Sequence, residues 1–556
     1  MTPNSRTFRA ALLAAVILFC SAANAKEPAS IPAVDAIFAD HDHTDTPGCA
    51  LGVIHDGEFI YRQGYGMANL EYDIPITSSS VFRIASTSKQ FTGMAVALLA
   101  ESGKISLQDS LSRFFPEFAD WAEQVTVMHL LQHRSGVRDY LTLAWLVGLT
   151  EYTDHYTLEW VLELLARQQE TNFEPGSEFL YSNSGYMLLA QIVERVTGQT
   201  LREYSEENIF GPLGMTHSRF QDNHAHIVRN RADGYERSDT GFDINMTTLN
   251  LVGDGSVFTS IDDLLLWDRN FYDNQLGKGD KDLVERAPEY DSDFYYAFGL
   301  EWNEYRGLNR VSHSGSFAGF RAEIMRFPEQ QFSVAVLCNR DDAAPTSLAN
   351  QVAGYYLQDV MKANDADDNA GDIAESQFPL SVLAGDYWDG TNMTSMRIEL
   401  DGDSLWSDHP EIGRYELGRI GALRWQLLDS PWEVTFDFEV ADGVTTGVDT
   451  EYFKSAWGSF VPFERAAVDT AELAAYAGNY YSPELDIEYQ LALSDGKFTF
   501  DLKGEHPQEL SPLFDGMFEN FNWGVFEFQK NDSGDVSGFL LHSGRVRNLA
   551  FTRSTP

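Results

Sequence analysis

The sequence predicts an α+β domain followed by two small antiparallel β-barrels. Strand patterns stand at both ends of the first part with helical and loop segments between them, so we expect its ends to meet in one antiparallel sheet. The last third of the chain repeats itself in short alternating strands with turn residues. An acidic stretch poor in apolar residues separates the two parts. The predicted boundaries are 1–25 for a signal peptide, 26–364 for the α+β domain, 365–378 for a linker, and 379–467 and 468–556 for the barrels.

One hairpin near the start of the domain and three strands near its end define the predicted sheet. "PGCALGVIHDGEFIYRQGYG" alternates around Asp56-Gly57, which is a hairpin signal. "RVSHSGSFAGFRAEIMRFPEQQFSVAVLCNRDD" indicates three strands, around His313, from Phe320 to Phe327 and from Phe332 to Asn339. A helix from about Pro345 to Met361 closes this part.

The repeat in the last third supports two barrels. "LAGDYWDG" begins at Leu383 and "YAGNYYSP" begins at Tyr476, an offset of 93 residues. "VPFER", ending at Arg465, similarly matches "LAFTR", ending at Arg553. Two copies are too few for a solenoid, so each copy is expected to close on itself.

The N-terminus indicates export. Arg6 and Arg9 precede an apolar stretch from Ala10 to Cys20, and the small-residue site Ala23-Asn24-Ala25 follows. We expect cleavage near Lys26 and a soluble periplasmic or secreted protein with no membrane span. The formal net charge of -45 disfavours nucleic acid and anionic membranes as partners. The oligomeric state is left open, and so is the question of whether Cys49 and Cys338 form a disulfide or remain buried thiols.

Ser86 and Lys89, in "FRIASTSKQFTG", are the first candidate catalytic pair. Residues i and i+3 share one face of a helix, so the lysine can lie beside the serine hydroxyl. A serine needs a neighbouring base to become a nucleophile, and a desolvated lysine can be neutral. The alternative is a surface lysine after a helix cap, which the long apolar run behind the pair disfavours.

Two later stretches supply further candidates. In "YSNSGY", Tyr181 offers a phenol that can carry a proton and Asn183 an amide that can bind a substrate amide. "HSGS", His313 to Ser316, lies on a predicted strand, where Gly315 permits close approach of a ligand. The N–H of Ser316 and that of Ser86 could then form an oxyanion hole. The alternatives are a polar loop capping a helix and a strand-end turn.

Together these three stretches resemble the penicillin-recognising serine hydrolases, which include class C β-lactamases, DD-peptidases, D-aminopeptidases and related esterases. "VTVMHLLQHRSGVRDY" and "GDGSVFTSIDDLLLW" add to the likeness, which covers about Pro32 to Tyr356. The resemblance implies a β-lactamase/DD-peptidase-like fold, with Ser86 as the acylated nucleophile and Lys89 and Tyr181 managing its proton. It also implies that Asn183, His313, Ser314 and Gly315 bind the substrate.

One departure from the family pattern bears on the substrate. β-Lactamases usually carry Lys-Thr-Gly where this chain has His313-Ser314-Gly315, and that lysine attracts the drug's carboxylate. A histidine is largely neutral near pH 7, which puts β-lactamase activity in doubt. D-Aminopeptidases of the family resemble this chain in having two trailing barrels, and a loop from the last barrel reaches their site. The candidate for that loop here is residues 503–524, and a carboxylate that pairs with a substrate ammonium is expected.

We therefore expect an exported serine hydrolase that acts through an acyl-enzyme on a small peptide, amide or ester, best matched to a D-aminopeptidase. DD-carboxypeptidase and small-ester hydrolysis are alternatives, and so is a binding protein for cell-wall peptides or β-lactams with negligible turnover. No cofactor or metal is expected. His129 and His133 have a metal-compatible i, i+4 spacing but lack the glutamate of His-Glu-x-x-His.

Overall fold

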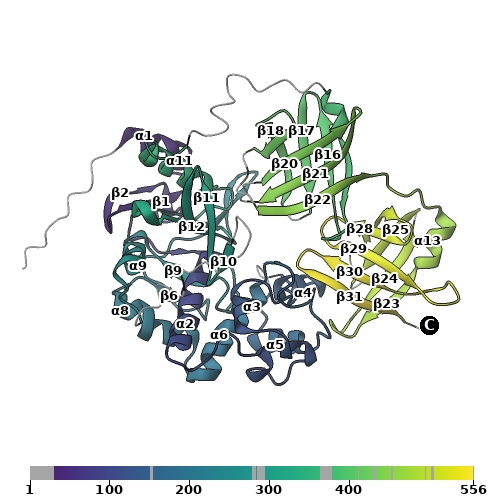
Figure 1. Cartoon of the computed structure of the whole chain (residues 1–556), viewed down its shortest axis with the longest axis horizontal. Coiled ribbons are helices and arrows are strands. Elements are labelled where there is room, and N and C mark those ends of the chain that lie inside the picture. Colours follow the sequence, from purple (N-terminus) through teal and green to yellow (C-terminus); the bar gives the residue numbers. More distant parts are fainter. Residues whose placement is uncertain are drawn as a thin grey trace, which may run out of the picture.

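A seven-stranded antiparallel sheet is the centre of the first domain, in the order β10-β11-β12-β13-β14-β1-β2 (Figure 1). The computed structural model describes residues 31–150, 154–277, 284, 295–362, 378–410, 412–428, 430, 434–452, 455–494, 496–502 and 506–554. The predicted signal peptide and nearly all of the predicted linker lie outside these residues. The sheet strands are β1 (Cys49–His55), β2 (Glu58–Tyr65), β10 (Tyr295–Ala297), β11 (Leu300–Tyr305), β12 (Leu308–Phe317), β13 (Phe320–Phe327) and β14 (Phe332–Cys338).

The expectation that the two ends of this domain meet in one sheet is confirmed, because β1 pairs antiparallel with β14. The β1–β2 turn has positive φ at both Asp56 (52°) and Gly57 (71°), the backbone that a tight hairpin requires. The smaller strands are β3 (Met67–Asn69), β4 (Ile74–Pro75), β5 (Phe82–Arg83), β6 (Arg219–Phe220), β7 (Tyr235–Ser238), β8 (Gly241–Ile244) and β9 (Val257–Thr259).

Helices cover both faces of the sheet because side chains alternate along its buried strands. Leu51 and Val53 of β1 pack in one cluster with α1 (Pro32–Asp35) and α11 (Pro345–Leu357), whereas Ala50 belongs to the larger cluster on the opposite face. The other helices are α2 (Lys89–Glu101), α3 (Val127–Leu131), α4 (Tyr140–Leu146), α5 (Leu158–Ala166), α6 (Asn183–Thr197), α7 (Leu201–Ser205), α8 (Gly211–Leu213) and α9 (Ile261–Asp273). Among the described residues, none of the helices is long and apolar enough to cross a bilayer.

The first barrel is closed, because its first and last strands pair with each other. Its strands are β15 (Gly385–Asp389), β16 (Thr394–Asp401), β17 (Ser404–His409), β18 (Gly413–Arg419), β19 (Arg424–Leu427), β20 (Val434–Ala441), β21 (Val444–Tyr452) and β22 (Ser455–Phe463).

The second barrel has nine strands and is nearly closed, since only Leu510 separates the two end strands of its sheet. Its elements are α13 (Thr470–Tyr476), β23 (Gly478–Ser482), β24 (Ile487–Ser494), β25 (Lys497–Asp501), β26 (Gln508–Glu509), β27 (Ser511–Phe514), β28 (Met517–Asn520), β29 (Gly524–Lys530), β30 (Val536–Ser543) and β31 (Val546–Arg553). The sequence repeat is visible in one buried tyrosine at the equivalent place in each barrel. The Tyr387 hydroxyl donates to the Leu383 carbonyl and the Tyr480 hydroxyl to the Tyr476 carbonyl, each at 2.7 Å.

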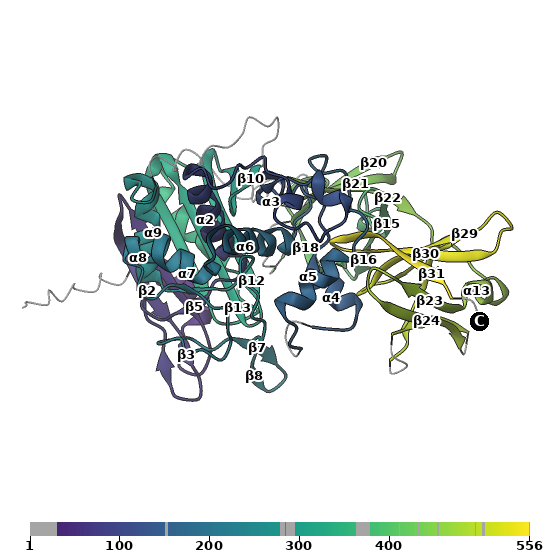
Figure 2. The same ribbon diagram turned by 90° about the horizontal axis from the view of Figure 1, so that it is seen from below.

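The second barrel packs on the first domain through α4 and its neighbourhood (Figures 1 and 2). Arg138, just before α4, is fully buried in this interface. Its guanidinium pairs with Glu484 of the barrel at 2.7 Å and donates to the carbonyls of Arg547 and Asn548, both at 3.1 Å. A buried charge is stable only where such partners replace water, so the domain and the barrel depend on each other.

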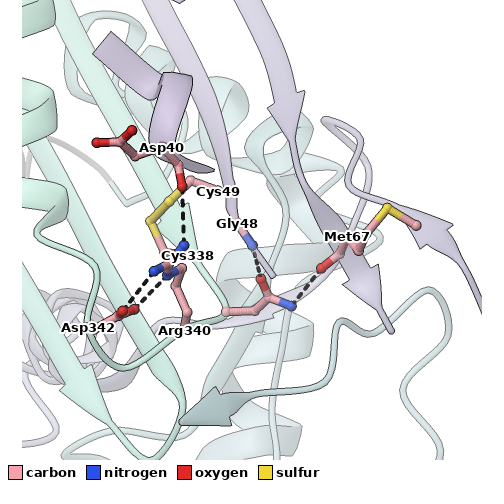
Figure 3. Close-up of a disulfide and its surroundings, with 8 residues drawn as sticks. Asp40, Gly48, Cys49, Met67, Cys338, Arg340 and Asp342 are labelled. Atoms are coloured by element: carbon pink, nitrogen blue, oxygen red, sulfur yellow. Dashed lines mark hydrogen bonds and ion pairs between the residues drawn. A yellow bond between two sulfur atoms is a disulfide. The ribbon is translucent and has the colours of Figure 1, made fainter. Parts of the chain in front are cut away.

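A disulfide joins Cys49 of β1 to Cys338 of β14, so the question that the sequence left open is answered (Figure 3). The two cysteines face each other in the strand register and are completely buried. Beside them Arg340 pairs with Asp342 and donates to the Asp40 carbonyl at 3.4 Å. The bridge joins residues 289 positions apart and therefore ties together the two ends of the first domain.

We expect the double substitution Cys49→Ala and Cys338→Ala to lower the free energy of unfolding by about 2–4 kcal/mol, because the unfolded chain regains the freedom of a long loop. Urea unfolding measures this. Thiol titration of the denatured mature protein should find no free thiol before reduction and two afterwards. Two free thiols in the unreduced protein would contradict the bridge.

Removing the partner of Arg138 should destabilise the protein strongly. Glu484→Ala removes the buried counter-charge of the Arg138 guanidinium and leaves only the largely exposed carboxylate of Glu170, at 3.5 Å, for which we expect a loss of about 3–5 kcal/mol. Glu484→Gln keeps an acceptor and should lose less. Glu488→Ala, at an exposed acid of the same barrel, is the matched control and should stay within about 0.5 kcal/mol of the wild type. Equal stability of the Glu484→Ala and Glu488→Ala variants in urea unfolding would refute a stabilising role for the pair.

Candidate active site

Ser86 lies in a short 3-10 turn, Ala85–Ser88, that leads directly into α2. Ala85 has a φ of 48°, a left-handed backbone that is strained for alanine and places a sharp bend immediately before the serine. Ser86 is partly exposed, whereas its neighbours from Phe82 to Ala85 and from Thr87 to Lys89 are buried. The turn therefore presents one hydroxyl from an otherwise buried segment.

The Lys89 amine is fully buried beside this hydroxyl. It donates to Ser86 Oγ at 3.2 Å, to Asn183 Oδ1 at 3.0 Å and to the carbonyl of Asp254. Burial is the main cause that lowers the pKa of Lys89 to about 7; the Asp254 carboxylate opposes this shift and the Arg545 charge adds to it. Near neutral pH a substantial fraction of Lys89 is thus an uncharged amine beside Ser86 and can accept its proton.

Tyr181 and Asn183 stand at the start of α6, where Ser182 caps the helix through the N–H of Gly185. The Asn183 N–H donates to Asp139 Oδ2 at 2.6 Å, and its side-chain carbonyl faces Lys89. Asp139 also caps α4, so one carboxylate sets the position of two helix starts.

The Tyr181 ring packs against the His133 ring and lies close to the side chains of Lys89 and Arg545. The His133 ring packs on it with centroids 4.1 Å apart, and the Lys89 amine lies 4.7 Å from its centroid. Its hydroxyl is buried without a well-aligned hydrogen-bond partner among the described residues. Burial raises the pKa of Tyr181 above its usual 10, although the nearby Ser86 hydroxyl and Arg545 lower it. In the resting site Tyr181 is therefore a phenol and not a phenolate.

Strand β12 brings the His313–Ser316 stretch to the same place. The strand β11 pairs only as far as Ser312, and beyond it β12 packs against the Ser86 turn, where Thr87 Oγ1 donates to the His313 carbonyl at 3.2 Å. A Cβ on Gly315 would lie 2.2 Å from the carbonyl oxygen of Ile84. Gly315 thus permits the close approach of another segment of the chain, the one that contains Ile84, rather than of a ligand. This contact fixes the distance between the Ser86 turn and β12. Ser314 is partly exposed and Ser316 is exposed.

His313 is almost fully buried. One ring nitrogen lies 2.9 Å from the Tyr296 hydroxyl and the other 2.6 Å from the Ser314 carbonyl. Burial and the neighbouring Lys89 lower the pKa of His313 to about 3. A neutral, buried imidazole does not supply the positive charge of the lysine that β-lactamases usually carry there.

The two histidines with metal-compatible spacing serve different purposes. His129 takes part in the capping box of α3, whereas His133 lies beyond that helix with a φ of 54° and packs on Tyr181. In the part of the chain that the structure describes, no group of three or more His, Cys, Asp or Glu side chains could hold a metal ion.

The second barrel contributes to the site through the turn between β30 and β31. Arg545 in this turn places its guanidinium 4.8 Å from the centroid of the Tyr181 ring. In the expected segment, residues 503–524, Trp523 packs on Trp145 of α4, and residues 503–505 lie outside the described residues, so a role for this segment at the site stays a prediction. The charge is opposite to the expected carboxylate, since the residue at the site is an arginine.

The structure brings the residues that the sequence patterns singled out close together, but those patterns gave no role to several residues that position them. Asp139 and Asp254 lie in stretches that contributed to the family likeness without receiving a role. Arg545 carried no local signal at all, because a Gly-Arg turn between two strands is ordinary in a barrel.

Comparison with known proteins gives the family. The family model described as Beta-lactamase matches residues 34–355. A D-aminopeptidase of Cereibacter sphaeroides (strain ATCC 17023) is 28% identical over 388 residues, 68% of this chain and 73% of that one. Penicillin-binding protein 4* of Bacillus subtilis (strain 168) is 27% identical over 306 residues, 51% of this chain and 66% of that one.

A solved structure agrees with the fold. The octameric penicillin-binding protein homologue from Pyrococcus abyssi superimposes with a TM-score of 0.55 and 24% identity, over 77% of this chain and 98% of that one. Because the family match covers nearly the whole α+β domain that holds Ser86 and Lys89, the chain belongs to the Beta-lactamase family and is a serine-type hydrolase.

Proposed function

We propose that this chain is an exported hydrolase that cleaves short peptides or amides of D-residues through an acyl-enzyme at Ser86. The observation that carries the proposal is the hydrogen bond from the buried Lys89 amine to the Ser86 hydroxyl, at 3.2 Å. Similarity to D-aminopeptidases supports the substrate class. The N-terminal signal pattern and the buried disulfide support export, since structural disulfides are typical of oxidising compartments.

In the proposed reaction neutral Lys89 accepts the Ser86 proton while Oγ bonds to the substrate carbonyl carbon. The N–H groups of Ser86 and Ser316 hold the oxyanion, and Asn183 binds the substrate amide. The C–N bond then breaks as the leaving amine receives a proton through Tyr181, which suits its raised pKa because a phenol can donate. Water repeats the cycle on the ester, releasing the acid and restoring the Ser86 hydroxyl.

β-Lactam hydrolysis is a weaker candidate than D-residue hydrolysis. The neutral, buried His313 leaves strand β12 without a charge for the drug's carboxylate. DD-carboxypeptidase activity remains a specific alternative, because Arg545 could take the carboxylate of a C-terminal residue. Small-ester hydrolysis and binding without turnover are the other outcomes that the experiments below separate.

We expect a fluorophosphonate probe to label the peptide that contains Ser86, and Ser86→Ala to abolish both the label and the turnover of D-alanine p-nitroanilide. The fold should persist, because a hydroxyl at a helix start contributes about 1 kcal/mol. Intact-protein mass spectrometry and circular dichroism measure these outcomes. Turnover that survives in Ser86→Ala would exclude the mechanism, whereas labelling without turnover of any D- or L-amide or ester would indicate a binding protein.

The rate should increase with pH through about 7. Only the neutral amine of Lys89 can accept the proton, and its pKa of about 7 makes that form dominant above neutrality. We expect kcat/KM for p-nitrophenyl acetate to rise between pH 6 and 8, after subtraction of the rate with Ser86→Ala. Lys89→Arg, which stays charged, should lose activity throughout. A profile that is flat from pH 5 to 9 would be inconsistent with Lys89 as the base.

A further inference from the structure

We propose that Arg545, delivered by the second barrel, binds a carboxylate of the substrate and so makes this site selective for anionic D-peptides or D-amides. This inference rests on the proposed function and narrows its substrate class. It assigns to the barrel a part in substrate selection rather than a purely structural role.

The turn that carries Arg545 is held firmly against the catalytic domain. The Arg545 carbonyl accepts from the N–H of Asp139 at 3.3 Å and from Asn172 Nδ2 at 2.9 Å. Asn172 in return accepts from the N–H of Arg547 at 2.8 Å. The Asp139 carboxylate also accepts from the N–H of Asn183. Asp139 therefore connects the backbone of Arg545 to Asn183 through two hydrogen bonds.

The side chain of Arg545 differs from the other arginines at this interface. Arg138 pairs with Glu484, and Arg547 pairs with Glu178 at 2.9 Å. Arg545 has no ion-pair partner among the described residues, and its contact there is the ring of Tyr181. It is half-buried, so its charge is screened less than that of a surface arginine.

The charge of Arg545 acts on the reacting groups. It lowers the pKa of Lys89 and opposes the rise in the pKa of Tyr181. A positive charge this close to Ser86 and Lys89, with no acid in ion-pair distance in the described part of the chain, favours an anion in the substrate. Arginine suits this purpose, because its planar guanidinium can bind a carboxylate through two parallel hydrogen bonds.

Two other basic residues at the site, Lys89 and His313, are less suited to bind a substrate carboxylate. Lys89 donates to Ser86, to Asn183 and to a backbone carbonyl. His313 is buried and neutral. The carboxylate could belong to the free C-terminus of a leaving residue or to an acidic side chain of the acyl residue, and matched substrates separate the two sources.

The test compares substrates that differ only in this charge. D-alanyl-D-alanine and D-alanyl-D-alaninamide probe the C-terminus, and D-glutamic and D-glutamine p-nitroanilides probe the side chain, with product measured by mass spectrometry. We expect the wild type to prefer the carboxylate in at least one pair. Arg545→Ala should reduce that preference, as a ratio of kcat/KM values, by about 10- to 100-fold, the size of one charge-assisted hydrogen bond. Arg545→Lys should restore part of it.

Lys104→Ala is the matched control for loss of one positive charge. Lys104 is exposed just beyond the far end of α2, about 20 Å from Lys89 by the rise of a helix, and should leave the preference unchanged. If Arg545→Ala lowers turnover of carboxylate and carboxamide substrates equally, Arg545 only positions or tunes the site and the inference fails. A wild type that does not distinguish the members of either pair would also overturn it.

A second measurement does not depend on turnover of D-substrates. N-acetyl-D-alanine should slow the labelling of Ser86 by a small fluorophosphonate more than N-acetyl-D-alaninamide does, and Arg545→Ala should remove the difference. If this selective protection is found but no D-peptide or D-amide is cleaved, the proposed function fails while the carboxylate site stands. If D-substrates are cleaved but protection shows no charge preference, the proposed function stands and the inference fails.

Discussion

The arrangement of the other residues of the site depends on one constraint, the burial of the Lys89 amine. A charged ammonium in that position would need a carboxylate partner, and none lies within ion-pair distance among the described residues. The amide oxygen of Asn183 and the backbone carbonyl of Asp254 match the two N–H groups of a neutral amine, whose lone pair is then left to face the Ser86 hydroxyl. The low pKa of Lys89 follows mainly from its burial, and the carboxylate of Asp254 opposes this effect. The buried amine needs hydrogen-bond partners, and three distant segments supply them through Ser86, Asn183 and Asp254.

Each of those segments is held by packing that leaves little freedom. Gly315 has no room for a side chain against the carbonyl of Ile84, so β12 and the Ser86 turn keep one separation. The carbonyl that Lys89 meets belongs to Asp254, whose carboxylate accepts from the Tyr140 hydroxyl at 2.8 Å. Preorganisation of this kind lowers the cost of bringing the reacting groups together at the moment of reaction.

The second barrel contacts both the first domain and the candidate site through two residues that are close in the chain, Arg545 in the turn between β30 and β31 and Arg547 near the start of β31. Arg547 pairs with Glu178 of the first domain and donates to Asn392 of the first barrel at 2.8 Å, so it links all three domains. Arg138 of the first domain is fully buried and pairs with Glu484 of the barrel. Removing the barrel would therefore expose a polar interface as well as take Arg545 from the site. Single substitutions in the turn separate these effects, whereas truncation would combine them.

Local sequence patterns were enough to predict several strands and turns and the spacing of the candidate site residues. The proximity of Ser86 and Lys89 could be predicted from their i, i+3 spacing, which the 3-10 turn running into α2 preserves. Tyr181 and Asn183 are two residues apart at the start of α6, and both contact Lys89. The Asp56-Gly57 hairpin, the strands from Phe320 to Cys338 and the repeated barrels were likewise predictable from alternation and turn residues.

Tertiary structure alone decided which distant residues meet. Cys49 and Cys338 could have been free thiols until strand pairing placed them opposite each other. Arg545 stands 364 positions after Tyr181 in the sequence, and nothing near it indicates an active site. The packing of the second barrel on the first domain brings them together, and it depends on the complementarity of two folded surfaces, which no single stretch of sequence contains.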